Sequence, residues 1–161
     1  MSVIERVRPA ALAATDATEG FLTLTVSGQL CGVPVHSVRD VLGPQAITRI
    51  PLAPPEVAGS LNLRGRIVTA VELRRRLGLP DREAGAAPAM SVVVEHQNEL
   101  YALLVDVVGD VVALSLNTVV ANPATLDAAW RDVSRGVCRD VPGSEGSLLI
   151  LLDVERVLAI G

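Results

Sequence analysis

Lysine is absent from this chain of 161 residues, whose 14 basic residues are all arginine. That absence excludes a P-loop nucleotide site, a Schiff-base lysine and any other lysine-dependent catalysis. Aromatic residues are almost as scarce, with one Phe, one Trp and one Tyr. The two cysteines, Cys31 and Cys138, lie far apart in the sequence. We interpret them as buried free thiols rather than as a disulfide or a metal-binding pair.

Long apolar runs are missing as well. None approaches the roughly 18 residues that a membrane span needs, and the apolar stretch after Arg6 and Arg8 is too short for a signal peptide. The net charge of −4 argues against a nucleic-acid partner, and the scarce aromatics provide no stacking platform for single strands. We therefore expect a soluble cytoplasmic protein that neither binds nucleic acid nor inserts into a membrane.

Valine is the dominant residue, with 25 copies in a chain that is half apolar. A core rich in β-branched residues and poor in aromatics favours sheet. Alternation, turn residues and prolines predict strands separated by loops, with a linker over residues 81–89 and a flexible tail over residues 1–18. The main expected strands are 21–26, 30–35, 67–71, 91–95, 100–105, 107–116 and 148–152.

An internal repeat organises these strands. Leu30–Val41 aligns without gaps on Leu100–Val111, and Ile67–Leu77 aligns in the same way on Leu148–Leu158. Duplication of a small five-stranded barrel explains both matches, although a valine-rich sequence can also produce part of them by chance. The predicted fold is all-β, with two five-stranded barrels side by side and short helices. The barrels are expected over about 19–80 and 90–161, and the C-terminal segment is a candidate for exchange between them.

Catalytic patterns are weak. His36 and His96 have no partner at metal or triad spacing, and the sequence has no nucleophile elbow, Cys-x-x-Cys motif or phosphate loop. Glu72 and Asp153 occupy equivalent repeat positions, where capping of a short helix is the simplest role. An enzyme or small-ligand binder would need more convergent polar groups. We expect no catalytic activity, no cofactor and no metal.

One dense cluster of arginines stands out in this acidic chain. Arg74, Arg75 and Arg76 are most simply a solvated helical face. Arg64 precedes Gly65, which permits a tight turn, and is expected at the rim of a barrel. There it can recognise a protein partner or satisfy loop carbonyl groups, and both roles stay open.

The segment Asn62–Val68 (NLRGRIV), followed by Val71–Arg74 (VELR), resembles the signature of the CheW family. These proteins are adaptors that couple chemoreceptors to the histidine kinase CheA. The resemblance extends over about residues 20–160 and implies two SH3-like barrels, in agreement with the repeat. Further similar segments are Phe21–Val26, Thr48–Pro51, Val105–Val111 and Leu148–Asp153.

The resemblance also implies partners: the regulatory domain of a CheA-type kinase, and the cytoplasmic hairpin tip of a methyl-accepting chemotaxis protein, bound in a groove between the barrels. It implies a protein that is monomeric when free and is recruited from the cytoplasm to membrane-bound receptor arrays. The alternative is a CheW-like adaptor of a surface-motility or biofilm pathway. For each valine that we place in the groove, an ordinary core role is the competing interpretation. The candidate receptor-binding residues are Val38, Asp40, Arg64, Val108 and Val111.

The chain departs from the family pattern at several positions. Thr69 stands where Pro is usual, Glu72 where Asp is usual, and Asp40 where Glu is frequent. Residues 121–130 match poorly and have no clear counterpart of an aromatic that often makes array contacts. The poor match over residues 121–130 bears on ring-type assembly with the kinase more than on receptor binding.

Overall fold

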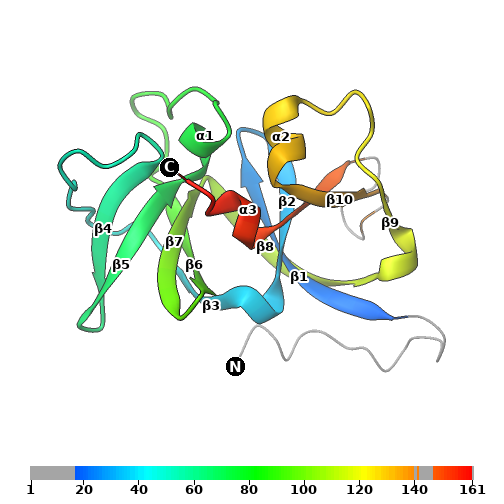
Figure 1. The fold of residues 1–161 in the computed structure, drawn as a ribbon, viewed down its shortest axis with the longest axis horizontal. Coiled ribbons are helices and arrows are strands. Elements are labelled where there is room, and N and C mark those ends of the chain that lie inside the picture. The colour runs from blue at the N-terminus through cyan, green and yellow to red at the C-terminus, as the bar shows by residue number, and fades with distance from the viewer. Residues whose placement is uncertain (1–16, 140, 142–146, 161) are drawn as a thin grey trace.

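The computed structural model describes residues 17–139, 141 and 147–160 (Figure 1). Residues 1–16 of the predicted tail lie outside the described residues, and the first strand begins at Thr18. The described chain forms eleven strands, three short α-helices and two 3₁₀ turns. The strands are β1 (Thr18–Val26), β2 (Gln29–Pro34), β3 (Val38–Leu42), β4 (Val57–Leu63), β5 (Arg66–Glu72), β6 (Met90–His96), β7 (Glu99–Val105), β8 (Val107–Ser115), β9 (Val119–Val120), β10 (Ser134–Cys138) and β11 (Leu149–Leu152). The helices are α1 (Leu73–Arg76), α2 (Ala128–Val133) and α3 (Val154–Val157), and the 3₁₀ turns are Val35–Ser37 and Leu116–Thr118.

The strands form two sheets that lie side by side (Figure 1). One has the order β8-β1-β2-β11-β10-β9 and the other β3-β6-β7-β5-β4. The predicted all-β fold with two small SH3-like barrels and short helices is confirmed. The extra strand of the six-stranded sheet is the two-residue β9, and in the other sheet a single bridge between Thr48 and Ser60 takes its place. No helix of the described chain is long and apolar enough to cross a membrane.

The strand registers carry the repeat that the sequence predicts. In the β1–β2 hairpin Leu24 pairs with Cys31. Under the alignment of Leu30 with Leu100, the equivalents of these two residues are Val94 and Tyr101, and they pair in the β6–β7 hairpin. The last strand of each half is equally regular. Thr69 of β5 pairs with Tyr101 in parallel, and its equivalent Ile150 of β11 pairs in parallel with Cys31.

The two halves nevertheless do not form one barrel each. β1 and β2 join β8 to β11, whereas β3 to β5 join β6 and β7. The boundary expected between residues 80 and 90 therefore divides the sequence repeat but not the sheets, and more than the C-terminal segment is exchanged. Similarity between two segments identifies equivalent strands, but it does not say which copy of a strand becomes the neighbour.

Three apolar clusters explain why continuous runs of apolar residues form strands. One cluster fills each barrel, and the largest lies between the sheets. In β11, Leu149 and Leu151 enter the interior of their own barrel, while Ile150 and Leu152 face the cluster between the sheets. A strand that is buried on both faces reads as an unbroken apolar run.

Two glycines at equivalent places permit close approach of neighbouring chain. Gly59 in β4 and Gly136 in β10 have φ values of +150° and +147°, and each lies at a register shift in its hairpin. A Cβ atom on Gly59 would lie 2.1 Å from the carbonyl oxygen of Thr48, and one on Gly136 would lie 3.0 Å from that of Val120. A larger residue at either bulge would therefore separate the strand from its neighbour.

Candidate functional site

Arg64 is presented to solvent by the tight turn between β4 and β5. Arg64 and Gly65 have φ values of 52° and 86°, the left-handed pair of a two-residue hairpin turn. The side chain of Asn62 closes the turn, because its Oδ1 accepts a hydrogen bond of 2.9 Å from the N–H of Gly65. The Arg64 side chain is 82% exposed. The turn therefore projects this guanidinium from the rim of the barrel.

The structure brings Arg64 to Asp40, another predicted site residue. Nη2 of Arg64 lies 3.4 Å from Oδ2 of Asp40, while Oδ1 of Asp40 accepts a hydrogen bond from the N–H of Val41. Asp40 is on β3 and Arg64 follows β4, and these are the two edge strands of the five-stranded sheet. An exposed pair of this kind contributes about 0–1 kcal/mol to stability. The pair is thus better suited to orienting a side chain for recognition than to holding the fold.

The three predicted valines lie on equivalent strands. Val38 of β3 pairs with Val94. Under the repeat, Val108 corresponds to Val38 and Leu24 to Val94, and Val108 of β8 pairs with Leu24. Val38, Val108 and Val111 are half-buried and pack against the cluster between the sheets. Each valine therefore has a core face and an exposed face, and its role in receptor binding stays a prediction.

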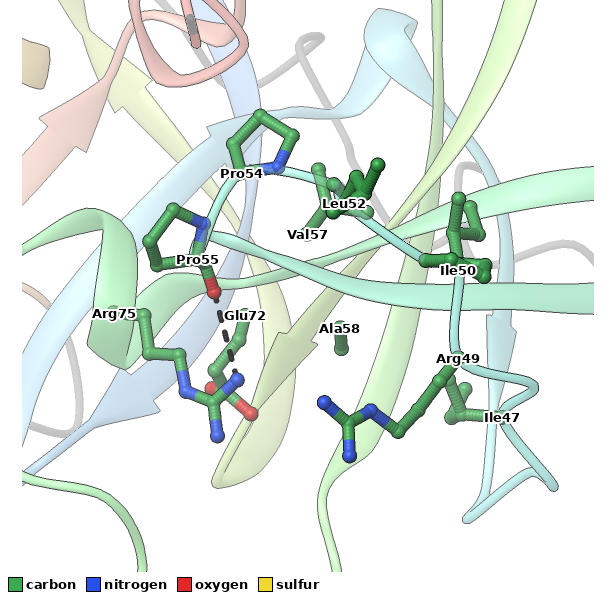
Figure 2. Close-up of a pocket in the computed structure, with 12 residues that line it drawn as sticks. Ile47, Arg49, Ile50, Leu52, Pro54, Pro55, Val57, Ala58, Glu72 and Arg75 are labelled. Atoms are coloured by element: carbon green, nitrogen blue, oxygen red, sulfur yellow. Dashed lines mark hydrogen bonds between the residues drawn. The ribbon is translucent and has the colours of Figure 1, made fainter.

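A second surface was missed by the sequence reasoning. The loop between β3 and β4 holds Leu52 fully exposed and Ile50 partly exposed, above a hollow of about 750 Å³ (Figure 2). Arg75 of α1 reaches the loop, since its Nη1 lies 3.5 Å from the carbonyl oxygen of Pro55. The prolines were a visible signal, but they indicated only a break in helix. The lining residues are Ile47, Arg49, Ile50, Pro51, Leu52, Ala53, Pro54, Pro55, Val57, Ala58, Glu72 and Arg75.

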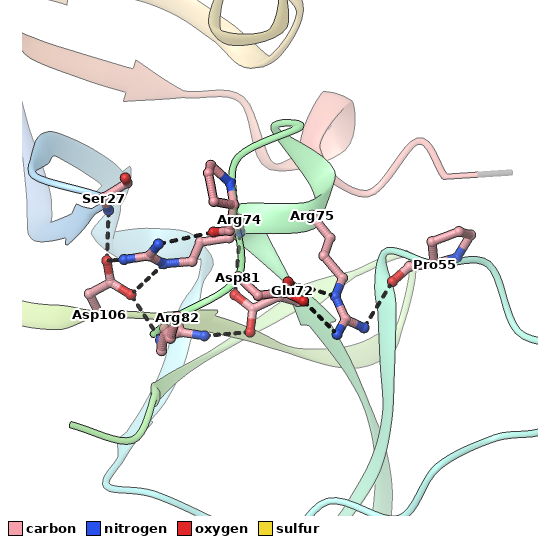
Figure 3. A network of polar contacts seen from close by, with 9 residues as sticks. Ser27, Pro55, Glu72, Arg74, Arg75, Asp81, Arg82 and Asp106 are labelled. Atoms are coloured by element: carbon pink, nitrogen blue, oxygen red, sulfur yellow. Dashed lines mark hydrogen bonds and ion pairs between the residues drawn. The ribbon is translucent and has the colours of Figure 1, made fainter. Parts of the chain in front are cut away.

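Arg74 and Arg76 of α1 are largely enclosed, so only Arg75 lies on the solvated face that we expected for all three. Arg74 donates two hydrogen bonds, of 3.1 and 2.8 Å, to the carboxylate of Asp106 (Figure 3). Arg82 of the linker enters the same network, with Nη1 at 2.6 Å from Glu72 and Nε at 2.9 Å from Asp106. The backbone N–H of Ser27 also donates to Asp106. We call Arg74, Arg82, Glu72, Asp106 and Ser27 the clasp, because they join the linker to both sheets.

The clasp changes the ionisation of its central carboxylate. Burial by itself would raise the pKa of Asp106, but the hydrogen bonds from Arg74 and Ser27 and the charge of Arg82 hold that pKa below its usual range. Glu72 has the capping role predicted for it, since its side chain accepts from the N–H of Arg74. Asp153 does the same for α3, accepting from the N–H of Arg156.

Arg76 joins the two halves on the same side of the molecule. Its Nε and Nη2 donate to the carbonyl oxygens of Val157 and Arg156 at the end of α3, at 2.9 and 2.8 Å. Nη2 also lies 3.2 Å from Asp132 on α2. A guanidinium at the end of a helix satisfies carbonyl groups that the helix leaves open. Arg76 is therefore a structural residue.

The two histidines lie close together on the surface. His36 and His96 line one hollow of about 250 Å³, together with Glu95, Arg135 and Asp153. In the described part of the chain no group of three or more His, Cys, Asp or Glu side chains is placed to hold a metal ion.

The comparisons with known proteins agree with this geometry. The model of the CheW-like domain matches residues 20–160. The chemotaxis protein CheW of Rhizobium meliloti (strain 1021) is 29% identical over 143 residues, covering 89% of both chains. That of Thermotoga maritima is 26% identical over 146 residues, covering 89% of this chain and 91% of the relative. The crystal structure of the scaffolding protein TtCheW from Thermoanaerobacter tengcongensis matches with a TM-score of 0.76 at 22% identity, over 90% of this chain and 95% of that one. The family match spans both barrels and includes the Arg64 turn, so this chain belongs to the CheW-like family.

Proposed function

We propose that this chain is a non-catalytic adaptor that couples chemoreceptors to a CheA-type histidine kinase in bacterial chemotaxis. The observation that carries the proposal is the family match over residues 20–160, which covers the whole two-barrel unit. The two solvent-facing surfaces support it, because an adaptor needs separate contacts for its two partners. In this role the protein works in the cytoplasm as a monomer and joins membrane-bound receptor arrays through its partners.

The receptor is assigned to the surface formed by β3, β8 and the Arg64 turn. The exposed faces of Val38, Val108 and Val111 supply apolar contact, the usual source of affinity at the centre of an interface. The exposed Arg64 guanidinium supplies orientation, because it can exchange its weak contact with Asp40 for a two-point contact with a carboxylate of the receptor hairpin.

The kinase regulatory domain is assigned to the surface around Leu52. Leu52 is fully exposed at the edge of a hollow. An apolar side chain in that position gains free energy when a partner covers it, so it can anchor an interface. The three clusters of buried residues make the two barrels one packed body. A shift of the receptor on one surface can then alter the kinase at the other by differential contact, which is the requirement for coupling.

Arg64→Ala tests the receptor surface, with Arg66→Ala as the matched control. Arg66 is an exposed arginine of the same hairpin and has no ion pair with a described residue. We expect Arg64→Ala to weaken binding of a purified receptor hairpin fragment about tenfold, in line with loss of one oriented charged contact. The thermal midpoint should stay unchanged. Equal effects of the two substitutions on binding would refute the assignment of Arg64, and a large fall in the midpoint would make Arg64 structural.

Leu52→Ser tests the kinase surface in the same way. It should abolish or strongly weaken binding of the CheA regulatory domain while leaving binding of the receptor fragment intact. Loss of receptor binding in Leu52→Ser, with kinase binding kept, would reverse the two assignments.

A further inference from the structure

The contacts between the two halves of the repeat do not depend on the halves belonging to one chain. The first half runs from β1 to α1 and the second from β6 to α3. Four ladders join unlike halves: β1 with β8, β2 with β11, β3 with β6, and β5 with β7. Each sheet is therefore completed by strands that the other half supplies.

These four ladders form two equivalent pairs. Val38 pairs with Val94 across β3 and β6. The repeat equivalents of these residues, Val108 and Leu24, pair in the same way across β8 and β1. The parallel ladders β5–β7 and β2–β11 correspond in the same way. Each half thus offers the other the same kind of surface that it receives.

The covalent connection between the halves is short and mostly exposed. It consists of residues 78–89, and residues 83–88 are exposed or partly exposed to solvent. A hydrogen bond of 3.0 Å from the N–H of Ala86 to the carbonyl oxygen of Glu83 makes a turn within it. Residues 78–81 are held against α1 by hydrogen bonds and by the ion pair of Asp81 with Arg75. Arg82 follows them, and its side chain is only 16% exposed and lies between Glu72 and Asp106 in the clasp.

We infer that this chain can exchange halves with a second copy of itself, and that the linker and its clasp keep the halves together in one chain. In the exchanged dimer, the first half of each copy completes its sheets with the second half of the other. All four ladders and the core between the sheets are kept. Such a dimer would carry each proposed partner surface twice.

Linker length decides between the two forms. A short flexible linker holds the two halves of one chain at an effective concentration on the order of 1 mM with respect to each other. At about 10 µM protein the exchanged dimer should therefore be on the order of 1% of the chains. Deleting residues 83–87 removes the turn and shortens the path from the clasp to β6, and a hinge loop that is too short favours exchange.

The test combines deletion of residues 83–87 with a reporter disulfide across one ladder. Thr25 of β1 pairs with Val107 of β8, so Thr25→Cys with Val107→Cys places two thiols at neighbouring positions of opposite halves. In the full-length linker these thiols should close within one chain. In the shortened chain they should join two chains, giving a covalent dimer on a non-reducing gel and a dimer by size-exclusion chromatography. Replacement of residues 83–87 by an equally long stretch of Gly and Ser should stay monomeric, and Thr25→Cys alone controls for Cys31 and Cys138.

A shortened chain that folds as a monomer would overturn the inference. So would a dimer whose reporter disulfides close within each chain, because that dimer is merely side by side. A second measurement covers the case in which the shortened chain does not fold. The double-cysteine chain with its full linker is unfolded, refolded under reducing conditions at about 1 µM and about 1 mM, the range that brackets the effective concentration, and then oxidised. Covalent dimer should increase markedly at the higher concentration, and its absence there would overturn the inference.

Discussion

Neutralising the central carboxylate of the clasp should destabilise the protein without changing its shape. Asp106→Asn keeps the size of the side chain but removes the charge that Arg74 and Arg82 share. Both guanidinium side chains are largely enclosed, at 17% and 16% exposure. They would retain their positive charges with one carboxylate, Glu72, left in the network.

The expected loss follows from the burial of the network. Removing one partner of a fully buried ion pair costs about 3–5 kcal/mol, whereas an exposed pair contributes about 0–1 kcal/mol. Asp106 is mostly enclosed, with 18% of its side chain exposed, and it also accepts from the N–H of Ser27. We therefore expect Asp106→Asn to lower the free energy of unfolding by about 2–4 kcal/mol.

Urea unfolding measures this loss, and Asp81→Asn is the matched control. Asp81 pairs with Arg75 in the neighbouring contact, but 63% of its side chain is exposed. Its replacement should leave the free energy of unfolding nearly unchanged, with the same dependence on urea. A loss below about 1 kcal/mol for Asp106→Asn, or equal losses for both variants, would refute the view that the clasp joins the halves.

The difference in free energy of unfolding between the wild type and Asp106→Asn should also depend on pH, and the direction of that dependence is a further test. Because the pKa of Asp106 is lowered in the folded protein, its stabilisation is complete above the unfolded pKa of about 3.9 and disappears as the pH falls through the folded value. The difference between the wild type and Asp106→Asn should be constant near neutral pH and close in acid. A difference that instead closed in mildly alkaline solution would contradict this role, because Asp106 does not titrate there.

Two further outcomes follow from local geometry. Gly59→Ala should lower the free energy of unfolding by about 3 kcal/mol in urea titration, because its Cβ would meet the carbonyl oxygen of Thr48, whereas Gly43→Ala, with open space around it, should change it by less than about 0.5 kcal/mol. Burial raises the pKa of the Cys31 thiol, so Cys31 should react with a thiol reagent only when the protein unfolds; fast reaction in the folded state would show that β2 opens locally.

Strand content and the repeat could be predicted from the sequence because both depend on local pattern. The alignment of Leu30–Val41 with Leu100–Val111 also relates the observed registers of β1–β2 and β6–β7. The neighbours of each strand could not be predicted in this way. Two equivalent hairpins offer the same kind of edge. The neighbours are decided where the chain passes from one sheet to the other, after β2 and after β7, and no local pattern marks those crossings.

The site was predicted unevenly for a similar reason. The Arg64 turn is encoded locally by Asn62 and Gly65, and it was found. The clasp joins residues of the hairpin turn at Ser27, of α1, of the linker and of the junction at Asp106, which lie up to 79 positions apart. No spacing along the chain marks such a set, so the sequence alone predicts a solvated Arg74. The exposure of Leu52 likewise depends on the path of a loop that has no periodic pattern.

Binding of the purified protein to the regulatory domain of its own organism's CheA, with and without a receptor hairpin fragment, is the most direct test of the central claim. Calorimetry should show 1:1 binding to the kinase domain, and that complex should still bind the receptor fragment. Arg64→Ala should weaken only the receptor step, and Leu52→Ser only the kinase step. A well-folded sample that binds neither partner would contradict the adaptor role.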